Sequence, residues 1–362
     1  MARLRLAIVH DWLTGTRGGE KCLEPLCRTW PDATLHTLLH VPGKVSPAIE
    51  ALKPRTSFLQ QLPKVERYYR YLLPLMPFAA NWRLPKCDVV LSFSHCVAKA
   101  ARPPAGVPHL CYCFTPMRYA WHMRESYFAA SPAWKRLAAN ALMTPLRWWD
   151  RATADRVTHF IAISKTVQTR IRQCYGRDST IIAPPVDTDF YTPANLSRED
   201  YYLCVSAFAP YKRIDLAIDA CSRIGRRLVV IGTGQDERRL RSMAGANVTF
   251  LGSQPDDVVR DHYRRCKALL FPGEEDFGIV PVEAMACGAP VIALGRGGAA
   301  ETVGGFGWLF EEQNLDSLCE TIQRFENEAA GFDATRARVR SELYRTERYV
   351  REMTEMVERW AK

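Results

Sequence analysis

Short runs of Val, Ile and Leu alternate along this chain with longer stretches in which apolar residues recur every three to four positions. Short continuous apolar runs are typical of strands buried on both faces, and the longer pattern is typical of amphipathic helices. Their alternation predicts βαβ units and parallel sheets. We expect strands at Leu4–His10, Val89–Phe93, His109–Cys113 and Phe160–Ile163, and then at Tyr201–Ser206, Arg227–Ile231, Val248–Leu251, Ala268–Phe271 and Pro290–Ala293.

A proline-rich stretch separates the two groups of strands. It reads Ile181-Ile-Ala-Pro-Pro-Val-Asp-Thr-Asp-Phe-Tyr-Thr-Pro193, and its adjacent prolines favour extended backbone. Because the alternation then restarts and completes a unit of its own, we predict an α/β protein of two Rossmann-like, doubly wound parallel-sheet domains that face a cleft, rather than one large sheet. The expected domains are residues 1–183 and 184–344. The last helix, roughly Ala334–Trp360, is expected to pack back on the first domain from about residue 345 to 362.

The composition is that of an ordinary globular protein. Of the 362 residues, 47% are hydrophobic and 24% are charged, and no apolar stretch reaches the roughly 18 residues of a membrane-spanning helix. The 12 cysteines are scattered without a CxxC pair, which argues against a zinc site and against a disulfide framework. Because Met1–His10 reads as a first strand rather than a signal peptide, we expect a cytoplasmic protein with reduced cysteines.

The net charge differs between the two halves. Residues 1–183 carry 26 Lys and Arg against 11 Asp and Glu (+15), while the remainder carries 23 against 28 (−5), which together give the formal charge of +10. A basic excess confined to one domain predicts an anionic partner, which can be a nucleic acid, an anionic lipid or a phosphorylated substrate.

Two acids stand on either side of a Phe-Gly pair in the second half. Glu275 lies in the loop after an expected strand, and Glu283 lies in the first turns of a helix that begins near Val280. Open parallel sheets bind ligands beyond the carboxyl ends of their strands. Gly278 permits a close backbone approach, and N–H groups at the helix start can meet an anion. The stretch therefore favours binding of sugar hydroxyls and a phosphate, with a glycosidase dyad and a simple helix-dipole role for Glu283 as alternatives.

A basic pair follows the first strand of the second half. Lys212 and Arg213, in Pro210-Tyr-Lys-Arg213, stand where a helix begins, and such cations can neutralise a diphosphate leaving group. Solvated charges at a helix start are the alternative interpretation. The nearby Gly232-Thr-Gly234 lacks the third glycine of a dinucleotide fingerprint, so it does not predict NAD binding.

These motifs resemble those of the retaining, nucleotide-sugar-dependent glycosyltransferases of family 4, which have two Rossmann-like domains (the GT-B architecture). The likeness covers almost the whole chain, and its glutamate motif is specific. In the second half it rests on Glu275-Asp-Phe-Gly-Ile-Val-Pro-Val-Glu283, Ala284-Met-Ala-Cys-Gly-Ala-Pro290, Pro210–Arg213, Gly232–Gly234 and Gly297-Gly-Ala-Ala-Glu-Thr-Val303. In the first half it rests on His10-Asp-Trp-Leu13, Gly18-Gly-Glu20, Thr115-Pro-Met-Arg-Tyr-Ala-Trp121, Ile163-Ser-Lys-Thr-Val167 and Pro184-Pro-Val-Asp187.

The resemblance implies a role for each matching residue. Glu283 would accept hydrogen bonds from the nucleotide ribose, Glu275 would hold the donor sugar's hydroxyls, and Lys212 would stabilise the departing phosphate. Backbone N–H groups of the Phe-Gly turn and helix start would hold the sugar or diphosphate, and the glycine pair of the first domain would let its backbone approach the diphosphate. The implied donor-binding residues are Gly18, Gly19, Lys212, Arg213, Glu275, Phe277, Gly278, Ile279, Val280 and Glu283, with Glu275 and Lys212 as the catalytic pair.

The sequence departs from this pattern at two positions. Many relatives carry an arginine where Ala207 stands, so Arg213 is expected to compensate. Relatives often carry a histidine where Phe114 stands, and phenylalanine can neither donate nor accept a proton. This substitution puts a catalytic histidine in doubt. The alternatives are His10, His95 and His122, each of which also suits a purely structural role.

A segment of the first half combines basic and aromatic residues. Leu62–Lys86 carries the basic residues Lys64, Arg67, Arg70 and Arg83 among tyrosines, leucines and a tryptophan. Such a mixture is typical of segments that lie in the headgroup region of an anionic membrane. A helical hairpin that packs these apolar groups on its own domain is the alternative. Arg–aromatic interleaving also suits RNA, but no nucleic-acid module is recognisable, so we expect no nucleic-acid partner.

The sequence thus predicts a glycosyltransferase at the inner face of the cytoplasmic membrane, peripherally associated with it. Its partners would be a sugar nucleotide, first choice GDP-mannose, and a lipid-linked acceptor glycan of surface polysaccharide synthesis, because the motif cluster looks like that of O-antigen and exopolysaccharide mannosyltransferases. No cofactor and no metal are expected, since no Asp-x-Asp motif follows a strand of the second half. A nucleotide-sugar epimerase of the same architecture, and a non-catalytic nucleotide-sugar-binding scaffold, remain the rival hypotheses.

Overall fold

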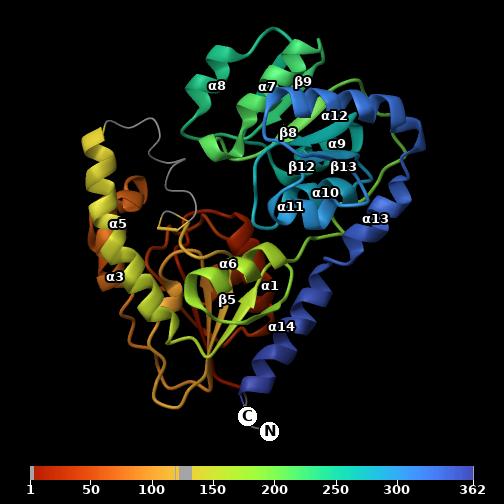
Figure 1. Cartoon of the computed structure of the whole chain (residues 1–362). Helices are drawn as coiled ribbons and strands as arrows, with labels where there is room; N and C mark the ends of the chain where they lie inside the picture. The colour runs from red at the N-terminus through yellow and green to blue at the C-terminus, as the bar shows by residue number, and fades with distance from the viewer. Residues whose placement is uncertain (1–3, 119, 122–132, 362) are drawn as a thin grey trace. The chain divides into compact units, whose positions relative to one another are not determined.

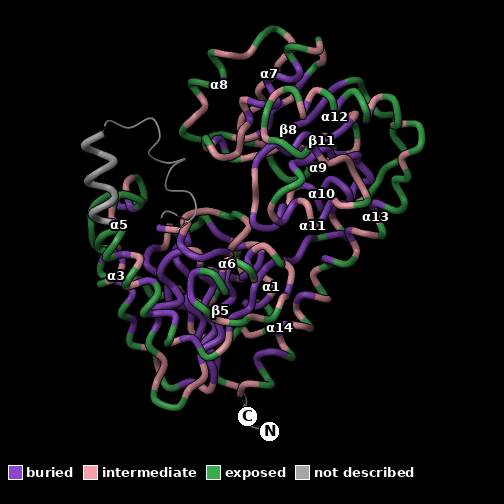
Figure 2. Tube along the Cα trace, viewed as in Figure 1, coloured by how far each residue is buried: buried purple, intermediate pink, exposed green. Residues whose placement is uncertain are grey.

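The computed structural model of the chain describes residues 4–118, 120–121 and 133–361, with the backbone alone for residues 133–142. It divides into two compact units, one formed by Met1–Ala183 with Tyr349–Lys362 and the other by Pro184–Arg348 (Figure 1). Each unit is built on one parallel sheet whose central strands are buried (Figure 2). The two doubly wound parallel sheets confirm the predicted fold class.

The sheet of the first unit has its first strand in the middle. The order is β3-β2-β1-β4-β5-β6-β7, and every neighbouring pair is parallel, with Leu6 of β1 opposite Val89 of β4. The strands of the central positions consist of buried residues, as the continuous apolar runs predict. The strands are β1 (Leu6–His10), β2 (Thr34–Thr37), β3 (Arg55–Thr56), β4 (Val89–Ser94), β5 (His109–Cys113), β6 (His159–Ala162) and β7 (Ser179–Ile181).

Helices of different length connect these strands. In α6 the Ser164 side chain accepts a hydrogen bond from the Val167 N–H, and Gly176 ends the helix in the left-handed conformation, the pairing of caps expected for a short surface helix. The helices are α1 (Gly18–Thr29), α2 (Pro47–Ala51), α3 (Met76–Ala79), α5 (Ala133–Ala154), α6 (Lys165–Tyr175) and the 3₁₀ turns η1 (Phe58–Gln61), η2 (Val65–Arg67), η3 (Tyr69–Leu75) and η4 (Ala98–Ala100).

The sheet of the second unit repeats the same winding. Its order is β10-β9-β8-β11-β12-β13, again parallel throughout. The strands are β8 (Tyr202–Val205), β9 (Leu228–Ile231), β10 (Val248–Gly252), β11 (Ala268–Phe271), β12 (Val291–Leu294) and β13 (Trp308–Phe310). The helices are α7 (Ile214–Arg223), α8 (Glu237–Met243), α9 (Asp256–Arg265), α10 (Ile279–Ala286), α11 (Gly297–Val303), α12 (Leu315–Glu328), α13 (Ala334–Glu342), with the 3₁₀ turns η5 (Pro210–Lys212) and η6 (Ala329–Gly331).

The single last helix predicted at Ala334–Trp360 is wrong. The chain forms α13 and then α14 (Thr346–Trp360), with a break between them. At the break the Tyr344 carbonyl accepts a hydrogen bond of 2.8 Å from the Val186 N–H, a backbone pairing that a continuous helix would not allow. Within the first unit, Tyr349 of α14 packs edge-on against Tyr112, and Trp360 stacks on His159.

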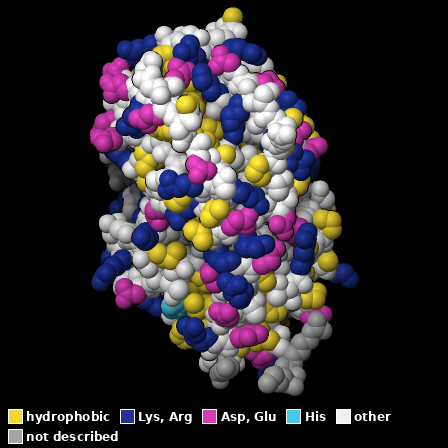
Figure 3. All heavy atoms as spheres, turned by 90° about the vertical axis from the view of Figure 1, so that its right-hand side faces the viewer, with side chains coloured by type: hydrophobic (Ala, Val, Ile, Leu, Met, Phe, Trp, Pro, Cys, Tyr) yellow, Lys and Arg dark blue, Asp and Glu magenta, His cyan; other side chains and the backbone are white. Residues whose placement is uncertain are grey.

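The surface around α13 and α14 is dominated by mixed charge. On the face shown in Figure 3, basic and acidic side chains are interspersed, in keeping with exposed pairs such as Arg345–Glu347. Exposed pairs of this kind contribute little to stability. In the described part of the chain, no helix has the length and apolar character needed to cross a bilayer.

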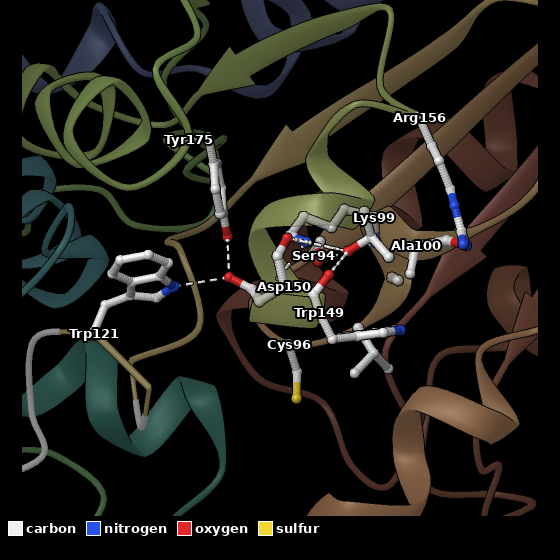
Figure 4. A network of polar contacts seen from close by, with 12 residues as sticks. Ser94, Cys96, Lys99, Ala100, Trp121, Trp149, Asp150, Arg156 and Tyr175 are labelled. Atoms are coloured by element: carbon white, nitrogen blue, oxygen red, sulfur yellow. Dashed lines mark hydrogen bonds and ion pairs between the residues drawn. The ribbon is translucent and has the colours of Figure 1, made fainter. Parts of the chain in front are cut away.

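A buried ion pair connects η4, which follows β4, to the helix α5 in the first unit. Lys99, which is 1% exposed, lies 3.0 Å from an Asp150 carboxylate oxygen and donates to the Thr153 hydroxyl at 2.8 Å. The Asp150 carboxylate also accepts hydrogen bonds from the Trp121 indole at 2.8 Å and the Tyr175 hydroxyl at 2.9 Å (Figure 4). The network therefore joins η4, α5 and α6 through Lys99, Asp150, Thr153 and Tyr175, all of which are buried.

We expect Lys99→Met to lower the free energy of unfolding by about 3–5 kcal/mol, because it leaves the Asp150 carboxylate buried without its cation. Adding Asp150→Asn removes that charge and should recover part of the loss. Urea denaturation followed by tryptophan fluorescence measures both changes. Lys86→Met, at an exposed lysine of the same unit, is the matched control. Equal stability of the Lys99 and Lys86 variants would contradict the role of the network.

Candidate functional site

The strand order places a ligand crevice beside β8 and β11 of the second unit. From β8 the chain winds outward through β9 and β10, and it then returns to β11 on the other side of β8. The connections that leave the carboxyl ends of β8 and β11 therefore run in opposite directions. Open α/β sheets bind their ligands at such a point, where the strand order reverses. The two predicted motifs, Pro210–Arg213 and Glu275–Glu283, follow these two strands.

The loop after β8 is held in place by two glycines that follow β9. A Cβ added to Gly232, whose φ is +136°, would lie 1.8 Å from the Ser206 carbonyl oxygen, and one added to Gly234 would lie 2.4 Å from the Phe208 carbonyl oxygen. The Phe208 N–H donates to the Thr233 carbonyl at 2.9 Å. The Gly232–Gly234 motif thus packs against the loop that carries Lys212, and its lack of side chains makes that close packing possible.

The loop after β11 brings Glu275 to Lys212. Their side chains form an ion pair and are 12% and 18% exposed. Gly273 permits the approach, because a Cβ there would lie 2.9 Å from the Lys212 carbonyl oxygen. A third loop closes on the same place: the Gly298 N–H donates to the Glu275 carbonyl at 2.6 Å, and a Cβ on Gly297 would lie 2.4 Å from that oxygen. The two predicted catalytic residues therefore lie together, half-buried, at the crevice.

Gly278 starts α10 in the left-handed conformation. Its φ of +87° is readily adopted only by glycine, and no side chain caps the first turn. Ile279 and Val280, both half-buried, open the helix, so their backbone N–H groups are among those without an acceptor inside the helix. The Phe277 ring points away into the core of the unit, where it packs against Tyr344 at 5.3 Å between ring centroids. The turn thus offers backbone groups rather than the Phe277 ring.

Glu283 is more buried than the implied ribose contact suggests. It is 4% exposed, and its carboxylate accepts a hydrogen bond of 3.2 Å from the Tyr263 hydroxyl of α9. Burial, followed by the nearby Glu283 charge, raises the pKa of Tyr263 well above its ordinary value, so the hydroxyl stays a donor. Tyr263 was not among the site residues predicted from the sequence. Its four-residue spacing from Val259 predicts a buried helix face, but nothing in the sequence indicates the partner of its hydroxyl.

Arg213 is directed to groups of its own unit. It has a left-handed φ of +52°, and its guanidinium donates to the Asp215 carboxylate at 3.2 Å and to the Gln313 carbonyl at 3.4 Å. A bound diphosphate would have to compete with Asp215 for this guanidinium. Ala207, where an arginine was expected from relatives, is exposed.

In the first unit, the glycine pair lies close to a histidine and to Phe114. Gly18 and Gly19 start α1, and a Cβ on Gly19 would lie 3.4 Å from both His10 Nε2 and the Phe114 ring. His10 is 1% exposed, and burial, the largest influence, lowers its pKa. Because Gly18 and Gly19 have no side chains, the backbone at the start of α1 can come close to a ligand. His122, one of the alternative histidines, lies outside the described residues, as does Tyr119 of the Thr115–Trp121 motif.

The basic segment of the first unit divides its apolar residues between core and surface. Tyr69, Met76 and Trp82 are buried in the unit's core, whereas Tyr71 and Phe78 are 85% and 72% exposed. The predicted docking residues Lys64, Arg67, Arg70 and Arg83 are all exposed. The segment therefore packs part of its apolar residues on its own domain, as the alternative interpretation predicts, and also presents exposed aromatic rings; membrane docking stays a prediction.

Two family models match successive parts of the chain. The model described as Glycosyltransferase Family 4 matches residues 16–190, and the one described as Glycosyl transferases group 1 matches residues 188–344. Together they cover residues 16–344, which takes in most of both units and the loops that carry Lys212 and Glu275.

Curated relatives and solved structures agree with this assignment. The chain is 29% identical over 202 residues to a GDP-mannose-dependent α-(1-6)-phosphatidylinositol monomannoside mannosyltransferase of Mycolicibacterium smegmatis (47% of this chain, 52% of the relative). It is 28% identical over 209 residues to the O-antigen chain mannosyltransferase RfbU of Salmonella typhimurium (51% and 58%). The alignments thus span about half the length of these relatives.

Among solved structures, HepE of Anabaena in complex with UDP and glucose superposes with a TM-score of 0.72 over 98% of this chain and 100% of that one, at 17% identity. That likeness establishes the fold, while the family models establish the kinship. The chain is therefore a member of the family 4 and group 1 glycosyltransferases, with the GT-B architecture of two Rossmann-like units.

Proposed function

We propose that the protein transfers a sugar from a sugar nucleotide to an acceptor hydroxyl with retention of configuration at the anomeric carbon. The observation that carries the proposal is the Lys212–Glu275 pair beside β8 and β11, next to the Gly278 turn and the start of α10. A cation, helix-start N–H groups and a carboxylate are the three groups that a sugar diphosphate needs. Membership of a glycosyltransferase family supports this assignment.

The ion pair suggests how the site responds to the donor. Glu275 and Lys212 neutralise each other in a half-buried place. A donor diphosphate binds Lys212 as a new anion, and Glu275 then accepts hydrogen bonds from the sugar's hydroxyls. As the bond between the anomeric carbon and the phosphate oxygen breaks, Lys212 stabilises the charge on the leaving diphosphate. The acceptor oxygen bonds to that carbon, its proton passes to the leaving phosphate, and positioning supplies the rest of the rate increase.

Mannose from GDP-mannose is the first choice of donor. Two curated relatives are mannosyltransferases, one of them GDP-mannose-dependent by name, and this supports the choice at modest identity. HepE was solved with UDP and glucose, so UDP-sugars are the second class of donor to compare with GDP-mannose in a binding assay. The donor is a substrate in this scheme, and no metal or further cofactor is required, because Lys212 and backbone N–H groups meet the diphosphate.

A lipid-linked glycan intermediate of surface polysaccharide synthesis is the proposed acceptor. The first unit holds the basic excess of the chain, and its Lys64–Arg83 segment presents exposed aromatic rings beside cations. These features suit a cytoplasmic enzyme that lies against the anionic inner face of the membrane and meets its acceptor there. They support peripheral attachment without any requirement for a nucleic acid.

Thermal-shift screening against GDP, UDP and ADP and their sugars identifies the donor, and Glu275→Gln then tests the site. We expect this variant to lower kcat/KM by about tenfold to hundredfold, because a hydrogen bond to a charged group contributes about 1.5–3 kcal/mol. GDP binding should be retained or tightened, since Glu275 holds the sugar in this scheme and its neutralisation frees Lys212 from a competing anion. Glu274→Gln is the matched control in the same loop. An unchanged kcat/KM in Glu275→Gln would refute the sugar-binding role.

Glu283→Gln tests the ribose contact. We expect the wild-type protein to bind GDP more tightly than 2′-deoxy-GDP, and this preference to vanish in Glu283→Gln, because the charged acceptor is lost. Isothermal titration calorimetry measures all four affinities. Tyr263→Phe removes the 3.2 Å hydrogen bond to the carboxylate but keeps the charge, and should weaken GDP binding by a smaller factor. A preference for the ribose that survives in Glu283→Gln would show that Glu283 is structural.

Replacing Arg67, Arg70 and Arg83 by Gln tests membrane attachment. Each cation near an anionic surface contributes about 1 kcal/mol, so the triple variant should bind phosphatidylglycerol vesicles at least about tenfold more weakly. Vesicle sedimentation measures this, with phosphatidylcholine vesicles as the neutral reference. Donor affinity should not change.

The control for this charge change is a triple variant of the second unit, at the exposed residues Arg227, Arg238 and Arg241. It removes the same charge but should sediment as the wild type does. Equal sedimentation of the two triple variants would mean that the Lys64–Arg83 segment is not the docking surface.

A further inference from the structure

A histidine and a carboxylate meet at the carboxyl edge of the first unit's sheet. Asp11 follows β1 and His95 follows β4, and these strands are the neighbours from which the chain winds in opposite directions. The Asp11 carboxylate is fully buried, and its Oδ2 lies 3.0 Å from His95 Nδ1. The pair thus occupies in this sheet the position that the Lys212–Glu275 pair occupies in the other.

Backbone donors hold the Asp11 carboxylate in one orientation. Its Oδ2 accepts hydrogen bonds from the His95 and Cys96 N–H groups at 2.6 and 2.9 Å, and its Oδ1 accepts from the Val97 and Ala98 N–H groups at 2.7 Å each. Burial by itself would raise the pKa of Asp11, but His95, through its side chain and its backbone N–H, lowers it to about 2. An ionised carboxylate only accepts hydrogen bonds, so His95 Nδ1 carries a proton toward Asp11, and Nε2 is the ring nitrogen on the other side.

The loop that carries His95 is anchored at its far end as well. The Lys99 N–H donates to the Ser94 hydroxyl at 3.2 Å, and the Lys99 side chain enters the buried network with Asp150 (Figure 4). His95 therefore sits in a loop fixed at both ends by buried charges, and its direction does not depend on a ligand. Such support is what a binding group needs in order to be pre-organised.

The surroundings of His95 suit a sugar ring. Its side chain is 31% exposed, the Trp12 ring stands edge-on to it at 4.5 Å, and the half-buried Phe114 ring lies at 6.2 Å between centroids. A ring nitrogen that can hydrogen-bond, beside a partly exposed aromatic ring, matches the hydroxyls and the apolar C–H face of a pyranose. His10 does not offer the same, because it is 1% exposed and its Nε2 points to Gly19.

We propose that His95, oriented by Asp11, binds a hydroxyl of the acceptor's sugar ring, which lies against Phe114. The inference rests on the proposed glycosyl transfer and names a binding site for its second substrate. The reaction needs no proton transfer to His95: the acceptor oxygen forms its new bond to the anomeric carbon, the bond from that carbon to the phosphate breaks, and the hydroxyl proton ends on the phosphate. Phe114, unable to accept a proton, serves as an apolar floor for the sugar.

Two substitutions of His95 separate this role from a structural one. In His95→Asn the amide reproduces the Nδ1–H donor to Asp11 but nothing replaces Nε2. In His95→Gln the amide reaches the position of Nε2 but not that of Nδ1. We expect His95→Asn to weaken sugar binding by about threefold to tenfold, the effect of one hydrogen bond, and His95→Gln to retain most of it. A purely structural histidine predicts the opposite order.

The probe is a panel of methyl glycosides of mannose, glucose, galactose, rhamnose and N-acetylglucosamine, with binding to the full chain followed by saturation-transfer NMR. A signal that survives Glu275→Gln and is reduced in His95→Asn supports the proposal. His159→Asn, at a partly exposed histidine that starts β6 at the opposite edge of the sheet, is the matched control.

Absence of any glycoside signal, or equal signals in His95→Asn and wild type, would overturn the proposal. GDP binding to the same samples tests the donor site separately, so loss of nucleotide binding with retained glycoside binding contradicts the proposed function and not this inference.

Discussion

The winding of the two sheets is the constraint on which the rest depends. In each unit the first strand lies at the middle, and the chain leaves it in one direction and returns to its other side. This order is possible because the central strands are apolar on both faces and are covered by helices. It brings polar loops that are distant in sequence to the same sheet edge, and all the candidate residues outside the basic segment lie there or in the first turns that follow.

The sequence was sufficient to predict most of this architecture, and its failures have a physical pattern. The nine expected strands all form, because each is a continuous apolar run. The strands β2, β3, β7 and β13 were missed. The edge strands β3, β7 and β13 are only two or three residues long and incompletely buried, whereas β2 is mostly buried but reads Thr-Leu-His-Thr and so has no apolar run. The break before α14 was missed because it depends on a backbone hydrogen bond to Val186, about 160 residues away in sequence.

Site residues were predictable only where local chemistry marks them. Lys212 and Glu275 stand out in loops after apolar runs, and the structure joins them. Two other features depend on contacts between elements that no local sequence pattern encodes. Glu283 is buried against Tyr263, and the Asp11 carboxylate accepts hydrogen bonds from four backbone N–H groups. Asp11 was visible in the His10–Leu13 motif, yet its function became apparent only when β4 was placed beside β1.

The glycines around the Lys212–Glu275 pair have a consequence for how this scaffold can vary. Carbonyl oxygens of the loops after β8 and β11 lie 1.8–2.9 Å from the points where Gly232, Gly273 and Gly297 would carry a Cβ. Loops that interlock through bare backbone cannot be lengthened or reshaped one at a time. We therefore expect sugar preference on this scaffold to diverge through substitutions of side chains in these loops, while the backbone conformations of the loops stay the same.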